Sequence, residues 1–177
     1  MYPSYVIHHD SCHDRDDIVK DIINKTKATV FQSYWLAEGL KGNTYSHIGV
    51  AKLAKTLHPD SKYIVFEDDC EILSDYNVML ESYKMADVLY LGYSDRCSHT
   101  TFGTHALVLS PKARDCIIQK AAELGEQVDR KWAFDWILSK LCRQEGLVVC
   151  MPNEKNRESF CRQKKGIQSY ITGQVRK

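Results

Sequence analysis

The fold is decided by the stretch Lys62-Tyr63-Ile64-Val65-Phe66-Glu67-Asp68-Asp69, in which an apolar run with strand character ends in three consecutive carboxylates. A buried strand does not favour charge at its end, and adjacent carboxylates repel one another. Two like charges ~4 Å apart cost roughly 1 kcal/mol in water and about 4 kcal/mol at an effective dielectric constant of 20. A folded protein therefore keeps such a cluster more easily when a cation neutralises it.

Two interpretations of the acidic motif Glu67-Asp68-Asp69 stay open on the carboxylates alone. Side chains alternate along a strand, so Glu67 and Asp69 are expected on one face and Asp68 on the other. Such a pair can hold a divalent cation through oxygen ligands, and that cation can stabilise a diphosphate as a leaving group. The alternative is a solvated acidic loop that follows a strand and binds nothing.

The composition is that of a soluble globular protein, with 44% hydrophobic and 27% charged residues in 177. This length suits a single domain over residues 1–177. A net charge of +1 argues against a general binder of nucleic acid or of membrane surfaces. We see neither a signal peptide nor a run near the ~20 apolar residues that span a bilayer, so a cytoplasmic location is expected. A piece of a longer enzyme would have the same composition.

The cysteines and histidines show no metal-binding pattern of a known kind. The seven cysteines include no CxxC pairs of zinc-ribbon type, so buried free thiols in a reducing compartment are expected. A cluster near the N-terminus has zinc-ligand chemistry, but its spacing matches no common zinc site; it comprises His8, His9, Asp10, Cys12 and His13.

Strand-like and helix-like segments alternate along the chain. Strands are expected over 5–8, 27–31, 62–66, 88–91, 104–109 and 147–151, and residues 94–102 are expected to form a loop. Helices are expected from Asp14 through Ile23, from a cap at Ser46 to Leu57, over 76–85, from Pro111 to Leu124 and over 130–144. The alternation predicts a layered, Rossmann-like α/β domain whose mostly parallel central sheet is flanked by helices.

Four segments, taken in order, resemble the motifs of one known family. They are Ser46-His47, the strand Ile64–Asp69, the segment Asp87-Val88-Leu89-Tyr90-Leu91-Gly92 and the strand-to-helix unit Gly103–Ala113. The family is that of bacterial lipopolysaccharide sugar transferases and procollagen galactosyltransferases, whose members often carry an Asp-Arg pair where this chain has Asp14-Arg15. The chain is short for the family, and His105 stands where the family has an aromatic residue.

The resemblance implies a GT-A-type fold, a nucleoside diphosphate sugar as donor, most often a uridine one, and Mn²⁺ (or Mg²⁺). It makes Asp69 the best metal ligand, with Glu67 as a ligand of the metal or of the ribose. The residues that it assigns to donor binding are Val6, Ile7, His8, Arg15, Glu67 and Asp68. In open α/β sheets such residues lie at the carboxyl ends of the strands.

Inverting sugar transfer needs a general base for the acceptor hydroxyl. Asp135 is the candidate, because the family tends to show an acid in this region and Trp132 and Trp136 could form a face on which a sugar stacks. The alternative is that both tryptophans belong to the core and Asp135 is solvated; Asp129 is the second candidate for the base. Basic residues of the C-terminal tail could offset the diphosphate charge, namely Arg162, Lys164 and Lys165.

The sequence thus predicts a small metal-dependent, hexosyltransferase-like glycosyltransferase that moves a sugar to a glycan or other hydroxyl acceptor with inversion. A nucleotidyltransferase is one alternative, although the segment His8–Cys12 after the first strand lacks the expected glycines. A non-catalytic nucleotide-sugar-binding module is another. A metal-dependent nuclease is disfavoured by the near-neutral charge. The sugar, the acceptor and the oligomeric state are not predicted.

Overall fold

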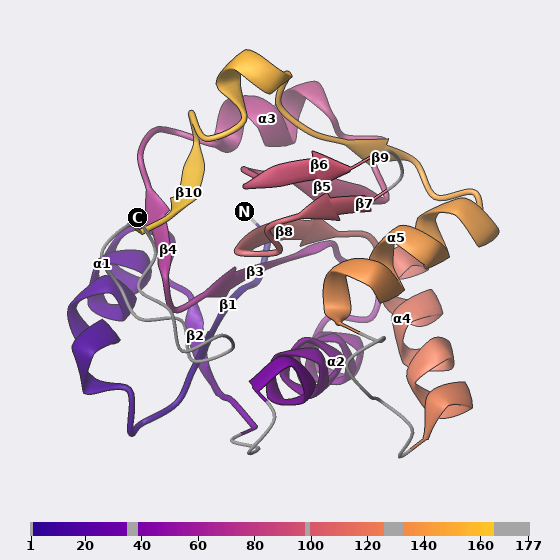
Figure 1. The fold of residues 1–177 in the computed structure, drawn as a ribbon, viewed down its shortest axis with the longest axis horizontal. Helices are drawn as coiled ribbons and strands as arrows, with labels where there is room; N and C mark the ends of the chain where they lie inside the picture. Colours follow the sequence, from indigo (N-terminus) through magenta and orange to yellow (C-terminus); the bar gives the residue numbers. More distant parts are fainter. Residues whose placement is uncertain (1, 35–38, 98–99, 126–132, 165–177) are drawn as a thin grey trace.

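The structure is a computed structural model that describes residues 2–34, 39–97, 100–125 and 133–164. Its centre is a six-stranded sheet in the order β2-β1-β3-β8-β5-β9 (Figure 1). These strands are β1 (Ser4–His8), β2 (Thr29–Gln32), β3 (Tyr63–Glu67), β5 (Val88–Tyr90), β8 (Ala106–Leu109) and β9 (Val149–Cys150). Neighbouring strands are parallel except at β8, which is antiparallel to both β3 and β5.

Helices cover both faces of the sheet, as Figure 1 shows. The α-helices are α1 (Asp16–Thr26), α2 (Gly39–Leu57), α3 (Asn77–Ser82), α4 (Pro111–Leu124) and α5 (Phe134–Gln144), and the 3-10 turns are η1 (His13–Arg15) and η3 (Glu154–Asn156). One core cluster packs α2, α4 and α5 on the sheet, and the other packs α1 and α3 on the opposite face. The predicted α/β class with a mostly parallel sheet is confirmed.

Strand β3 lies in the middle of this sheet and supplies side chains to both cores. Tyr63 and Val65 belong to the cluster under α2, α4 and α5, whereas Ile64 and Phe66 belong to the cluster under α1 and α3. All five residues of β3 are buried. A strand that is covered on both faces has a continuous apolar sequence, which explains the run before the acidic motif.

One predicted helix start is confirmed and another is wrong. Ser110 caps α4 by accepting a hydrogen bond from the Ala113 amide at 3.1 Å, as the Ser-Pro pair predicted. Helix α2 begins at Gly39 rather than at Ser46. Ser46 lies inside that helix, where its hydroxyl donates to the Gly42 carbonyl at 2.7 Å and accepts from the Tyr34 amide at 3.0 Å. Both bonds satisfy the serine without a cap.

Two small antiparallel pairs stand beside the main sheet and were not predicted. Strand β4 (Cys70–Ile72) pairs with β10 (Cys161–Gln163), and β6 (Asp95–Cys97) pairs with β7 (Thr100–Phe102), so the loop expected over 94–102 is wrong. Strands of three residues are too short to show alternation. The β10–β4 pair brings the Lys164 amide to the Asp69 carbonyl at 2.7 Å.

The structure also bears on the membrane and cysteine predictions. Within the four described ranges, no helix is long and apolar enough to cross a membrane. Six of the seven cysteines are free thiols, and Cys12, Cys70 and Cys161 among them are buried.

Candidate active site

The acidic motif lies at one edge of the sheet, where β1 and β3 end together. These strands are parallel, with Ile7 opposite Glu67, so His8 and Asp68 follow at the same edge. Strand β8 starts there from the other direction, and the Glu67 amide donates to the His105 carbonyl at 2.9 Å. The topology therefore gathers polar side chains from the first, second and third quarters of the chain.

Glu67 is buried among three hydrogen-bond donors. Its Oε1 accepts from Thr104 Oγ1 at 2.7 Å, from His47 Nε2 at 3.1 Å and from Asn43 Nδ2 at 3.2 Å. Burial alone raises the pKa of the Glu67 carboxyl, but the bonds from His47, Thr104 and Asn43 outweigh it and lower that pKa to about 2. Because a carboxylate only accepts, His47 donates through Nε2, and α2 is tied to β3.

Asp68 faces the other side of the sheet, where it contacts Arg15 and His8. Arg15, in η1, donates to Asp68 Oδ1, and His8 Nδ1 lies 3.1 Å from Asp68 Oδ2. The His8 ring also lies 3.2 Å from Asp16 Oδ1 through Nε2. The bond with Asp68 raises the pKa of His8 against the opposing effect of burial. The Asp-Arg pair of the sequence is thus attached to the acidic motif through Arg15.

Asp69 is buried at the turn that follows β3. Strand β3 ends at Glu67, and Asp68 and Asp69 form a turn before β4, so strand alternation does not extend to Asp69. Burial lowers the pKa of Arg15, but the charges of Asp68 and Asp69 outweigh burial and raise that pKa. Both carboxylates therefore lie near the guanidinium group. The Arg15 side chain therefore supplies part of the positive charge that neutralises the acidic motif.

The donor groups at this edge fit one kind of metal site better than another. The described residues contain no group of three histidine, cysteine or acidic side chains arranged to hold a metal ion. Mg²⁺ and similar ions at nucleotide sites, however, use one or two carboxylates together with substrate phosphates. Asp69, with Glu67 close by in the sequence, suits a site in which one or two carboxylates share the metal with substrate phosphates. The metal ligands remain a prediction.

Asp135 is brought to the same edge by the start of α5. Burial and the charge of Glu67 raise the pKa of the Asp135 carboxyl to about 7. A hydrogen bond from the Gly103 backbone lowers that pKa but does not outweigh the two other effects. Its Oδ1 is buried without a hydrogen-bond partner among the described residues. The ring of Phe134 stacks on His47 with centroids 4.1 Å apart, which seats the start of α5 next to the partner of Glu67.

The remaining predicted donor residues lie on β1. Val6 is fully buried in the core under α1, and Ile7 is buried in the core under α2. Only His8, at the end of the strand, contacts the polar residues of the site. The donor binding that was expected of these three residues stays a prediction.

Other residues from the sequence have structural positions. His105 is fully buried beneath the site, Trp136 is 51% exposed and so does not belong to the core, and Arg162 donates to Glu71 Oε2 at 2.8 Å. Asp129, Trp132 and Lys165 lie outside the described residues.

Sequence reasoning missed Asn43 and Thr104. Asn43 lies four residues before His47, a helical spacing that would have placed both on one face of a correctly predicted α2.

No protein-family model and no curated protein sequence matches this chain. Solved structures do. One is a glycosyltransferase involved in the glycosylation of the major capsid of PBCV-1, with a TM-score of 0.58 and 8% identity over 85% of this chain and 81% of that chain. Another is the glycosyltransferase GlyE of Streptococcus pneumoniae TIGR4, with a TM-score of 0.55 and 12% identity over 88% of this chain and 46% of GlyE. This chain has the GT-A-type fold of these glycosyltransferases. It spans about half the length of GlyE.

Proposed function

We propose that this protein is a metal-dependent glycosyltransferase. It would move a sugar from a uridine diphosphate donor to an acceptor hydroxyl, with inversion at the anomeric carbon. The observation that carries the proposal is the position of Asp135, whose carboxyl has a pKa of about 7 beside an acidic motif. The glycosyltransferase fold supports the same reaction class.

Asp135 suits the general base of a single displacement. The acceptor oxygen attacks the anomeric carbon of the donor sugar while the bond from that carbon to the diphosphate breaks, and Asp135 takes the hydroxyl proton. A base works best when its pKa lies near the operating pH, and about 7 meets that condition. An exposed aspartate with its ordinary pKa near 4 would be a weaker base.

The donor side of the site rests on the acidic motif. Asp69 and Glu67 would hold Mn²⁺ or Mg²⁺, which when bound neutralises charge on the diphosphate. Asp68 fixes Arg15 and His8 at the carboxyl end of β1. Positioning of this kind, together with a preorganised charge distribution, supplies most of the acceleration in transfers that need little covalent chemistry from the protein.

Calorimetric titration with nucleoside diphosphates, with and without Mn²⁺, tests the donor assignment. We expect Mn²⁺-dependent binding of UDP by the native protein, its loss in Asp69→Ala and its retention in the matched control Asp17→Ala on the exposed face of α1. Circular dichroism establishes that both variants are folded. Absence of binding by every diphosphate, or equal binding by folded Asp69→Ala, would overturn the assignment. Release of UDP from a UDP-sugar separates an enzyme from a binding module.

A further inference from the structure

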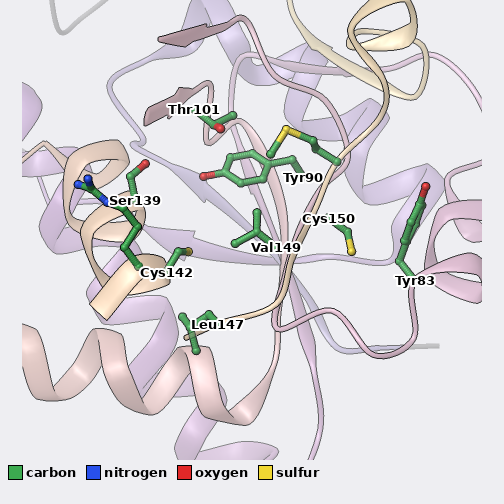
Figure 2. A pocket seen from close by; sticks show the side chains of 10 residues that line it. Tyr83, Tyr90, Thr101, Ser139, Cys142, Leu147, Val149 and Cys150 are labelled. Atoms are coloured by element: carbon green, nitrogen blue, oxygen red, sulfur yellow. The ribbon is translucent and has the colours of Figure 1, made fainter. Parts of the chain in front are cut away.

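A cavity of about 570 Å³ opens beside β5, β9 and α5 (Figure 2). Its wall includes Tyr90 from β5, Val149 and Cys150 from β9, Ser139 and Cys142 from α5, and Thr101 from β7. None of the three carboxylates of the acidic motif lines it. Its volume is within the range of roughly 300–1,000 Å³ that small-molecule sites occupy.

The cavity begins about one helical turn from Asp135. Asp135, Ser139 and Cys142 are spaced at i, i+4 and i+7 on α5, so they follow one face of that helix. At 1.5 Å per residue, Ser139 lies ~6 Å along the axis from Asp135. On the opposite wall, Thr101 lies two residues from Gly103, whose backbone bonds to Asp135. The cavity and the base are therefore neighbours.

Three residues with hydroxyl groups line the cavity, one each from β5, β7 and α5. Figure 2 shows the Tyr90 hydroxyl directed toward α5, with Ser139 and Thr101 close to it in the view. The Tyr90, Thr101 and Ser139 side chains are each more than nine-tenths buried. Burial, Cys142 and Asp135 raise the pKa of Tyr90, which also places its hydroxyl near the base.

We propose that this cavity binds the acceptor as a neutral sugar ring, which lies against Tyr90 and exchanges hydrogen bonds with Ser139 and Thr101 while its reacting hydroxyl reaches toward Asp135. The proposal rests on the proposed function, because it gives that reaction its acceptor. Hydroxyl side chains both donate and accept, as sugar hydroxyls do. The apolar wall of Leu147 and Val149 suits the C–H face of a pyranose. Among the described lining residues none is acidic, and the charged one, Arg143, can donate hydrogen bonds to sugar hydroxyls.

Saturation-transfer NMR with the methyl glycosides of glucose, galactose and N-acetylglucosamine tests the proposal on the native protein. We expect at least one glycoside to bind, and Ser139→Leu, which fills the cavity, to abolish that binding. The matched control Thr56→Leu also replaces a helical hydroxyl residue but lies on the exposed end of α2, so its binding is unchanged. Tyr90→Phe keeps the cavity shape and removes one hydroxyl, which predicts a roughly 3- to 10-fold weaker Kd.

UDP binding with Mn²⁺, measured on the same samples, separates this proposal from the proposed function. Ser139→Leu retains UDP binding if the cavity holds only the acceptor. Should UDP bind while no glycoside does, or should glycosides bind equally to the native protein, Ser139→Leu and Tyr90→Phe, the cavity proposal is wrong and the donor assignment stands. Glycoside binding that needs Ser139, without any UDP binding, would support the cavity and overturn the proposed function.

Discussion

At the scale of single residues, the acidic motif has three carboxylates in three environments. Glu67 accepts hydrogen bonds from side chains of α2 and from Thr104, Asp68 binds Arg15, and Asp69 is buried in the turn. Repulsion among the three is reduced because the first is held by hydrogen bonds and the second by a guanidinium. The chemistry expected of this edge therefore concentrates on Asp69 and Asp135.

Replacing Asp135 by asparagine should lower sugar transfer by ~10²- to 10⁴-fold, the usual contribution of a general base. The native rate should rise as the pH increases through about 7, because the carboxylate becomes ionised there, and Asp135→Asn should lose that dependence. Release of UDP from a UDP-sugar, followed from pH 5 to 9, measures both effects. Asp17→Asn is the control. A variant that keeps the native rate and pH profile would exclude Asp135 as the base.

The same substitution should change stability in a direction set by the raised pKa. The folded pKa of about 7 exceeds the ordinary 3.8, so the native state favours protonated Asp135. Its contribution to stability is complete below pH 3.8 and is lost as the pH rises through about 7. Asp135→Asn should therefore be more stable than the native protein at pH 8, by on the order of 1–4 kcal/mol, and similar at pH 4.

Urea unfolding at both pH values, followed by circular dichroism, measures this difference. Asp115→Asn on α4 is the control, and its change in stability at pH 8 is expected to have the opposite sign. Burial raises the pKa of Asp115, but hydrogen bonds and charges from Lys55 and Arg114 outweigh it and lower that pKa. If Asp135→Asn were less stable than the native protein at pH 8, the carboxylate would be stabilised where it lies and its pKa would not be raised.

At the scale of elements, strands β4 and β10 connect the acidic turn to the C-terminal part of the described chain. Gly92 allows this, because a Cβ there would lie 1.8 Å from the Cys161 carbonyl oxygen. Gly92→Ala should displace β10 and destabilise the protein by more than ~2 kcal/mol, since the obstacle is backbone that cannot rotate away. Amide hydrogen exchange of Cys161–Gln163 should accelerate more than that of β3. Native exchange at those amides in folded Gly92→Ala would show that β10 tolerates the methyl group.

The elements also show how far sequence reasoning reaches. The strand β3, the cap at Ser110 and the α/β alternation could be predicted because periodicity and capping act within a few residues. The start of α2 was misplaced because Gly39 and Gly42 disfavour a helix locally, and packing against the sheet overrides that preference. The bond from Arg15 to Asp68 joins residues 53 positions apart, and no local pattern encodes it.

At the scale of the whole molecule, the two parts of the site lie on different segments of the chain. The end of β1, the turn η1 and the end of β3 with its following turn carry His8, Arg15 and the acidic motif. Strands β5, β7 and β9 and helix α5 carry the cavity and Asp135. The antiparallel strand β8 joins them, because it pairs with β3 on one side and with β5 on the other. Donor and acceptor groups thus meet across β8.

This division predicts that donor binding and turnover can be lost separately. UDP with Mn²⁺ at ~100 times its Kd should stabilise the native protein by about 2.7 kcal/mol, which for a chain of this size raises Tm by roughly 5–10 °C. Asp135→Asn should show the same rise, because its carboxyl acts on the acceptor, and Asp69→Ala should show none. Thermal scans with and without UDP and Mn²⁺ measure the rise. Loss of the shift in Asp135→Asn, or its persistence in Asp69→Ala, would mean that the two segments do not divide donor binding from chemistry.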